Sequence, residues 1–237
     1  MTLLQFAIGS ANDALDAERD AGRADKPIPA GMVGRRSAAM ASIVCAASGL
    51  ALSAPSGTLT LGIAVLGLAT GLLYDLRFRG TSASWLPFAV GVPLLPVYGW
   101  VGATGRLPIE FAVLVPCAML SGMGIAIANA LADVERDRRA GADSIARSLG
   151  PDRAWRIHVA LLGAASVAAL ASIVALRGAG DRGSDVGIGV ALAGVAIVAI
   201  GARLAGRQGT VERGWEVEAI GLATLAIGWV VAVGLGA

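Results

Sequence analysis

The feature of this sequence that most restricts its fold is a series of long apolar segments separated by short charged loops. A helix needs roughly 20 apolar residues to cross the hydrocarbon core of a bilayer. Only 15% of the residues are charged, whereas a soluble domain has about a quarter. We therefore predict an all-α, polytopic transmembrane helical bundle. Its seven spans are expected at residues 37–55, 57–76, 84–103, 108–132, 154–176, 185–204 and 216–236.

The basic residues are concentrated in alternate loops between these spans. Four loops contain most of the 19 Lys and Arg residues, at positions 15–36, 75–83, 133–156 and 203–215. The positive-inside rule places these loops in the cytoplasm. The net charge of +2, with no basic patch outside the loops, gives no indication of a nucleic-acid partner. We expect an integral membrane protein, of the bacterial plasma membrane, that works among membrane lipids.

Two of the cytoplasmic loops begin with nearly the same acidic pattern. On a helix, side chains at i, i+4 and i+8 lie along one side, where like charges repel unless a cation lies between them. Mg²⁺ prefers carboxylate oxygens and commonly binds together with phosphate groups. The pattern therefore predicts a metal–diphosphate site at the cytoplasmic surface. Its residues are Asn12, Asp16 and Asp20 in the first loop, and Asn129, Asp133 and Asp137 in the second.

The histidine and the two cysteines carry weaker signals. Cys45 and Cys117 fall inside apolar spans without a CxxC partner, so we expect buried, small hydrophobic residues. His158 opens a later span beside Arg153 and Arg156. Because no other metal-ligating side chains are close in sequence, we expect it to pack at the interface or contact a headgroup.

Four motifs, in the same order along the chain, resemble those of the UbiA-type intramembrane prenyltransferase superfamily. Residues 12–20 are similar to its NDxxDxxxD motif, and residues 133–141 are similar to DxxxDRxxG. Residues 26–31 resemble the (R/K)P(I/L)xxG segment that follows the first motif. Residues 74–81 resemble the family's loop motif Tyr-x-x-x-x-(Lys/Arg)-x-Thr. Four ordered matches are far more specific than a single DxxxD.

The resemblance implies nine transmembrane helices around a central cavity, with both Asp motifs at the cytoplasmic end. This sequence offers seven full spans and an N-terminal half-helix, because its first ten apolar residues cover only about 15 Å as a helix. We therefore expect a single prenyltransferase-like domain over residues 1–237. It would lack the family's first helix and half of the second. The explanations are a misplaced start codon, a fragment of a longer protein, or a genuinely shortened protein.

The resemblance also implies roles for individual residues. Asp16, Asp20, Asp133 and Asp137 are expected to be catalytic as carboxylate ligands, and the Mg²⁺ ligands are Asn12 and these four aspartates. The residues expected to bind the diphosphate are Asn12, Asn129, Arg23, Lys26, Arg79 and Arg138. Tyr74 completes the catalytic set, since its ring could favour the allylic cation by cation–π attraction; core packing is the alternative role.

Two further carboxylates are less defined. Asp13 faces about 100° away from Asn12 on a helix and is a weaker candidate. Asp75 is either a third acidic residue of the site or a partner of Arg77.

The resulting prediction is a Mg²⁺-dependent enzyme that transfers an isoprenyl group from an allylic polyprenyl diphosphate to a lipid-soluble, often aromatic acceptor and releases pyrophosphate. One alternative is a membrane terpene cyclase of the same superfamily, which uses no acceptor. The other is a transport or non-catalytic binding protein, whose function would survive replacement of the aspartates. The sequence leaves the acceptor and the prenyl chain length open.

Overall fold

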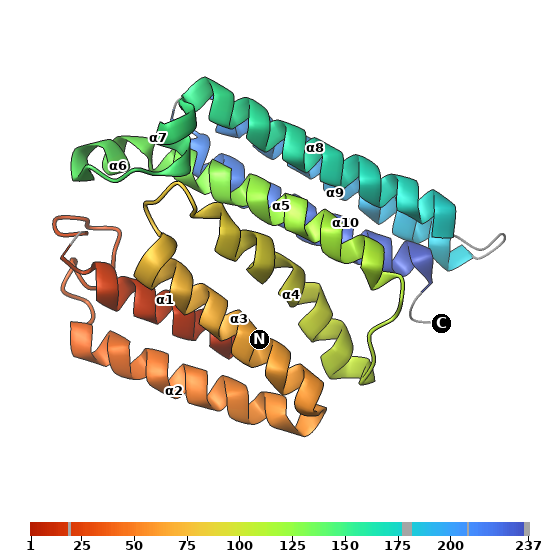
Figure 1. The fold of residues 1–237 in the computed structure, drawn as a ribbon, viewed down its shortest axis with the longest axis horizontal. Helices are drawn as coiled ribbons and strands as arrows, with labels where there is room; N and C mark the ends of the chain where they lie inside the picture. The colour runs from red at the N-terminus through yellow and green to blue at the C-terminus, as the bar shows by residue number, and fades with distance from the viewer. Residues whose placement is uncertain (19, 177–181, 208, 235–237) are drawn as a thin grey trace. The chain divides into compact units, whose positions relative to one another are not determined.

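The computed structural model describes residues 1–18, 20–176, 182–207 and 209–234 (Figure 1). All regular structure in these residues is helical, and seven helices are long and apolar enough to cross a membrane. These spans are Arg35–Ser56, Thr58–Phe78, Trp85–Thr104, Phe111–Ala132, Pro151–Leu176, Asp185–Ala205 and Val211–Val233. The all-α fold and the seven predicted spans are therefore confirmed. Residues 235–236 of the last predicted span lie outside the described residues.

The chain forms two compact units, and residues 1–79 and 94–107 make up the first. In this unit α1 packs against both α2 and α3. Two glycines allow the close approach, since a Cβ at Gly71 would lie 2.3 Å from Ile8 Cδ1 and one at Gly49 would lie 2.7 Å from Leu4 Cδ2. The elements are α1 (Thr2–Asp16), α2 (Arg35–Ser53), η1 (Ala54–Ser56), α3 (Thr58–Leu73), η2 (Tyr74–Phe78) and the second part of α4 (Trp85–Thr104).

The second unit contains residues 80–93 and 108–237. Within it α5 packs on α8, α9 packs on α10, and α10 also contacts α5 and α8. These four long helices bury a core of mostly small and aliphatic side chains. The unit's elements are the first part of α4, α5 (Phe111–Ala132), α6 (Val134–Ala140), α7 (Ile145–Leu149), α8 (Pro151–Leu176), α9 (Arg182–Ala205) and α10 (Val211–Val233).

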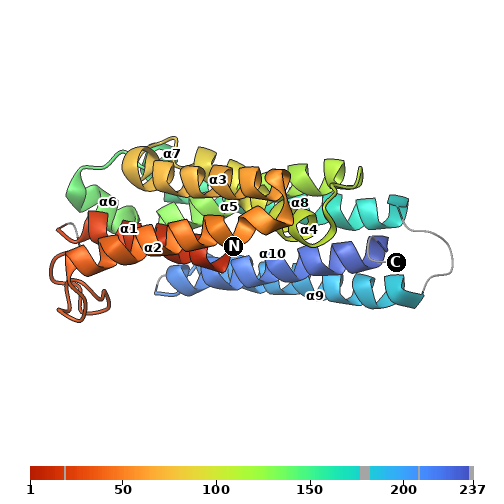
Figure 2. The same ribbon diagram turned by 90° about the horizontal axis from the view of Figure 1, so that it is seen from below.

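The closest helix pair in the second unit is α9 with α10, which run side by side (Figure 2). A glycine recurs every seventh residue on the facing sides of both helices. A Cβ at Gly194 would lie 2.4 Å from the backbone nitrogen of Leu225, and one at Gly221 would lie 2.6 Å from that of Val198. Small residues of this kind let transmembrane backbones pack closely. The glycines are Gly187, Gly194 and Gly201 on α9, and Gly214, Gly221 and Gly228 on α10.

Candidate active site

The first acidic motif lies at the C-terminal end of α1 and in the turn that follows. Because α1 ends at Asp16, only Asn12 and Asp16 share its helical side, one turn apart. The expected helical stripe of three residues is therefore wrong for Asp20, which lies beyond the helix. The Asp20 backbone N–H still donates to the Asp16 carbonyl oxygen over 2.8 Å. Asp20 is buried after this turn, with 7% of the residue exposed.

Two basic residues from later segments of the same unit pair with this motif. The Lys26 ammonium donates to Asp13 Oδ1 over 3.0 Å, and the Arg79 guanidinium donates to the carboxylate of Asp16. All four side chains are largely shielded from solvent, so these pairs are screened less than pairs on an open surface. Lys26 and Arg79 therefore reach the carboxylates of the first motif.

A third basic residue, Arg23, is shared between two carboxylates. Its Nη1 lies 3.5 Å from Asp20 Oδ1, and its Nε donates to Asp25 Oδ1 over 3.1 Å. The hydrogen bond from Arg23 lowers the pKa of the exposed Asp25 carboxyl below its ordinary value. Arg23 thus links the buried aspartate of the motif to a carboxylate in open solvent.

A compact turn positions Lys26 after the motif. The Ala30 N–H donates to the Lys26 carbonyl over 3.0 Å, and the Met32 N–H donates to the Pro27 carbonyl over 2.9 Å. Gly31 closes the turn with φ +74°, a conformation that favours glycine. The proline and glycine of this segment therefore fold the chain back so that the lysine is held at α1.

Asp75 joins the first motif through Asn12. Asn12 Nδ2 donates to Asp75 Oδ1 over 2.8 Å, while Asp75 Oδ2 is buried without a hydrogen-bond partner. Asp75 lies in η2, a π-helical turn in which the Arg79 N–H donates to the Tyr74 carbonyl over 2.8 Å. Such turns are frequent at functional sites. The half-buried Tyr74 begins the turn that carries both Asp75 and Arg79 toward α1.

The second acidic motif spans the junction of α5 and α6 in the second unit. Asn129 lies in the last turn of α5, Asp133 caps that helix, and Asp137 lies on α6. The Asp137 N–H donates to the Asp133 carbonyl over 2.9 Å, so the turns follow one another although the helix is interrupted. Asp137 is 5% exposed. Gly141 ends α6 in the left-handed conformation, at φ +68°.

Two basic residues of the second motif pair with nearby carboxylates. Arg136 donates to the carboxylate of Asp133. The Arg138 guanidinium instead donates to Glu135 Oε2 over 2.7 and 3.1 Å. The side chains of Arg138 and Glu135 are 68% and 62% exposed. Arg136 lies three residues after Asp133, a spacing that brings two side chains together over one helical turn.

The donor chemistry of both motifs suits Mg²⁺, because every predicted ligand offers oxygen. Within the described ranges, no three or more His, Cys, Asp or Glu side chains gather into a metal site. Mg²⁺ usually binds one or two carboxylates and completes its shell with phosphate oxygens and water. The buried, unpartnered Oδ2 of Asp75 adds one more oxygen suited to a cation. These residues therefore fit a metal that is bound together with a diphosphate.

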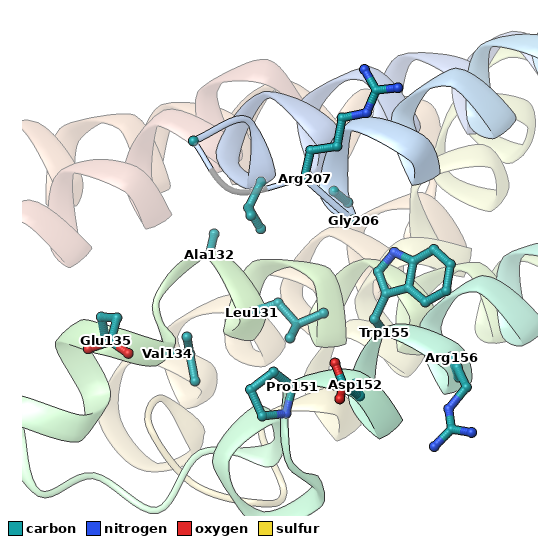
Figure 3. Close-up of a pocket in the computed structure, with 13 residues that line it drawn as sticks. Leu131, Ala132, Val134, Glu135, Pro151, Asp152, Trp155, Arg156, Gly206 and Arg207 are labelled. Carbon is teal, nitrogen blue, oxygen red and sulfur yellow. The ribbon is translucent and has the colours of Figure 1, made fainter.

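A cavity of about 770 Å³ opens beside the second motif, within the second unit (Figure 3). Trp155 forms part of its wall and donates from Nε1 to the Ala202 carbonyl over 3.3 Å. Arg156 and Arg207 point in different directions (Figure 3). Ala132 and Val134 line it on either side of Asp133 in the chain, but Asp133 and Asp137 are not among its lining residues. Its lining residues are Leu131, Ala132, Val134, Glu135, Pro151, Asp152, Trp155, Arg156, Ala205, Gly206, Arg207, Gly209 and Val211.

The fold and these side chains define an integral membrane protein with clusters of carboxylates, arginines and a lysine suited to binding a metal and phosphate. The sequence profile of the UbiA prenyltransferase family matches residues 1–215. The chain belongs to this family, which confirms the resemblance seen in its four motifs. It is therefore an integral membrane enzyme of the prenyltransferase class.

Two proteins that are similar to this chain are archaeal. The chain is 31% identical to the digeranylgeranylglyceryl phosphate synthase of Methanopyrus kandleri over 201 residues, which cover 73% of each chain. It is 29% identical to the synthase of the same name from Sulfolobus acidocaldarius over 157 residues. The second alignment covers 64% of this chain and 56% of the relative, so the chain spans little more than half the length of that protein.

Solved structures show the same fold. A UbiA homolog from Archaeoglobus fulgidus bound to GPP and Mg²⁺ matches with a TM-score of 0.69 at 18% identity, over 98% of this chain and 87% of the homolog. The apo structure of a UbiA homolog from Aeropyrum pernix K1 matches with a TM-score of 0.66 at 22% identity, over 97% and 85% of the two chains.

Proposed function

We propose that this chain transfers an isoprenyl group from an allylic diphosphate to a lipid-soluble acceptor at the cytoplasmic face of the membrane, with Mg²⁺, and releases pyrophosphate. The observation that carries the proposal is the set of carboxylate–cation pairs around the first motif. Arg79 with Asp16, Lys26 with Asp13, and Arg23 with Asp20 bring together the two kinds of side chain that a metal–diphosphate complex requires. Membership of the prenyltransferase family supports the same chemistry.

These ion pairs would separate when the diphosphate binds. Arg79 and Lys26 would leave their aspartates for phosphate oxygens, the arginine with two parallel hydrogen bonds and the lysine as a point charge. The aspartates would then be free for the metal. When bound, Mg²⁺ neutralises charge that develops on the leaving diphosphate. The proposed metal ligands are Asn12, Asp16, Asp20, Asp133 and Asp137, and the proposed diphosphate ligands are Asn12, Asn129, Arg23, Lys26, Arg79 and Arg138.

Tyr74 and Asp75 would support this site from η2. We propose that Asp75 acts through its hydrogen bond to Asn12, which fixes the amide of that residue at the end of α1. Tyr74 would face the allylic carbon atoms, where an aromatic ring stabilises positive charge. Both residues depend on the same π-helical turn.

The acceptor we propose is a lipid that carries a glyceryl phosphate group. The support is the name of the relatives, since digeranylgeranylglyceryl phosphate is a glyceryl phosphate that bears two geranylgeranyl groups. Its acceptor hydroxyl would form the new C–O bond to the allylic carbon as the bond to the diphosphate breaks, and its proton would pass to the departing pyrophosphate. A terpene cyclase would need no such acceptor.

Metal removal and product analysis test the proposed function together. The purified chain in lipid nanodiscs, given geranylgeranyl diphosphate, geranylgeranylglyceryl phosphate and Mg²⁺, is expected to release pyrophosphate and to form a lipid with two geranylgeranyl groups. EDTA should abolish both, and added Mg²⁺ should restore them. Pyrophosphate release with a cyclic hydrocarbon product and no acceptor would instead identify a cyclase. No release under any of these conditions would contradict the proposal.

The Arg79→Gln variant tests the proposed diphosphate contact. Loss of this guanidinium should raise the KM for the allylic diphosphate by about 10- to 100-fold, because a charge-assisted contact is worth roughly 1.5–3 kcal/mol. The matched control is Arg35→Gln, in the same unit, since Arg35 pairs with the exposed Glu18 over 2.9 Å. Steady-state kinetics should show a KM for Arg35→Gln within about twofold of the unmodified chain. Equal KM values for the two variants would remove Arg79 from the proposed site.

A further inference from the structure

A histidine and a glutamate are fully buried among the membrane-spanning helices of the second unit. His158 on α8 and Glu218 on α10 are each 0% exposed. His158 Nε2 lies 2.8 Å from Glu218 Oε1, and His158 Nδ1 lies 3.0 Å from the carbonyl oxygen of Gly124 on α5. The expectation that His158 packs at the interface or contacts a headgroup is therefore wrong. We call His158, Glu218 and the Gly124 carbonyl the His–Glu clasp.

The hydrogen bonds determine how many protons the clasp holds. The Gly124 carbonyl can only accept, so His158 Nδ1 carries a proton. The contact between Nε2 and Glu218 Oε1 then needs one more proton, on either the nitrogen or the oxygen. Both forms have a net charge of zero. Neutrality of the pair lowers the cost of keeping two ionisable groups inside a membrane.

Two glycines make room for the clasp. A Cβ at Gly201 on α9 would lie 2.5 Å from Glu218 Cγ, and a Cβ at Gly124 would lie 2.6 Å from Leu162 Cδ2 on α8. Gly201 therefore leaves room for Glu218 between the closely packed α9 and α10, and Gly124 lets α5 approach α8. Fully buried ionisable residues in membrane-spanning helices are rare and commonly have a function.

We propose that His158 and Glu218 are positioning residues that hold the end of α5 with the second acidic motif. Gly124 precedes Asn129 by about one and a half turns, or roughly 7 Å of helix, and Asp133 follows one turn later. A hydrogen bond to the backbone of α5 fixes the rotation of that helix about its axis and its position along that axis, relative to α8 and α10. Asn129 and Asp133 are thereby held in place for the metal–diphosphate complex. This inference rests on the proposed function.

Three variants separate positioning from general packing. Glu218→Leu keeps an aliphatic side chain of similar size and removes the contact with His158. Glu218→Gln keeps the contact, because its amide N–H can donate to the unprotonated Nε2 of a neutral His158. Ser172→Ala is the matched control, since Ser172 on α8 accepts a hydrogen bond of 2.7 Å from Trp229 Nε1 on α10. That bond is also buried and joins the same two helices, but it does not involve α5.

Hydrogen–deuterium exchange is the first readout, and it does not depend on catalysis. Amides of residues 129–137 should exchange about tenfold faster in Glu218→Leu than in the unmodified chain, whereas Glu218→Gln and Ser172→Ala should leave them unchanged, since local opening follows the loss of local contacts. His158→Leu removes both this contact and the hydrogen bond to the Gly124 carbonyl. It should therefore raise the exchange of residues 129–137 at least as much as Glu218→Leu, and it replaces that variant if Glu218→Leu does not fold.

The Mg²⁺ dependence of pyrophosphate release is the second readout. Glu218→Leu should raise the half-saturating Mg²⁺ concentration by about 10-fold, because residues that orient metal ligands typically change metal affinity by 10- to 100-fold. Its KM for the acceptor should not change. The proposal is overturned if Glu218→Leu and Ser172→Ala give the same exchange in residues 129–137, or if Glu218→Gln behaves like Glu218→Leu. An inactive unmodified chain would count against the proposed function, while the exchange experiment would still decide the role of the clasp.

Discussion

Asp16→Asn is expected to lower the rate of pyrophosphate release at least about 100-fold, because electrostatic stabilisation of a leaving group commonly contributes that much. The asparagine keeps the size of the side chain and one oxygen, but it removes the negative charge that a metal needs. The side chain of Asp16 is 13% exposed and pairs with Arg79. Because little solvent reaches this side chain, water cannot readily take the place of the lost carboxylate. Rates at saturating diphosphate and a range of Mg²⁺ concentrations provide the measurement.

The control for this substitution is Asp152→Asn. Asp152 is an exposed carboxylate in the first turn of α8, outside both motifs. Its loss should leave the rate within about twofold, as expected for an exposed charge. Asp133→Asn should behave like Asp16→Asn, since both motifs are proposed to act on the same diphosphate. A normal rate in Asp16→Asn would remove the first motif from the chemistry and favour a transport or binding role.

Gly194→Ala is expected to destabilise the second unit. The added Cβ would lie 2.4 Å from the Leu225 nitrogen and 2.8 Å from the Gly221 carbonyl oxygen, so α9 and α10 would have to move apart. Overpacking of this kind costs about 1–3 kcal/mol, which corresponds to a fall in Tm of roughly 3–10 °C for a chain of this size. Thermal unfolding in detergent, followed by the loss of helical circular dichroism, measures the change.

The matched control lies on the same helix. A Cβ at Gly189 would meet no atom within 4 Å, so Gly189→Ala adds a methyl group to an open surface. Alanine is favoured over glycine in a helix by roughly 1 kcal/mol, so this variant should keep or raise the Tm. Equal Tm values for the two variants would show that the glycines do not determine the packing of α9 and α10.

Much of the fold follows directly from the sequence, because the length of an apolar segment and the bilayer thickness together define a transmembrane helix. The span 108–132, for example, corresponds to Phe111–Ala132. The packing of the helices was harder to foresee. The sevenfold glycine spacing on α9 and α10 is visible in the sequence, but it identifies a contact only when two such helices are known to be partners.

The site was predictable where its residues are close in sequence. The turn after the first motif brings Lys26 to Asp13 through its Pro and Gly residues. Contacts between distant segments were not accessible in this way. The bond between Asn12 and Asp75 depends on the π-helical turn after α3, and the His–Glu clasp depends on the packing of three helices. Periodicity gives the side of a helix on which a residue lies, but it does not give the residue that meets it there.

We propose that both acidic motifs bind one diphosphate, and the binding affinities of single and double variants test this proposal directly. Calorimetry would measure the affinity for geranylgeranyl thiolodiphosphate, an analogue that resists cleavage, in the presence of Mg²⁺. We predict that Asp16→Asn and Asp133→Asn each weaken binding by at least about 10-fold, and that the double variant is little weaker than either single one, because residues of one site are not additive. Full affinity in either single variant, or losses that multiply in the double variant, would show that the two motifs do not bind one diphosphate together.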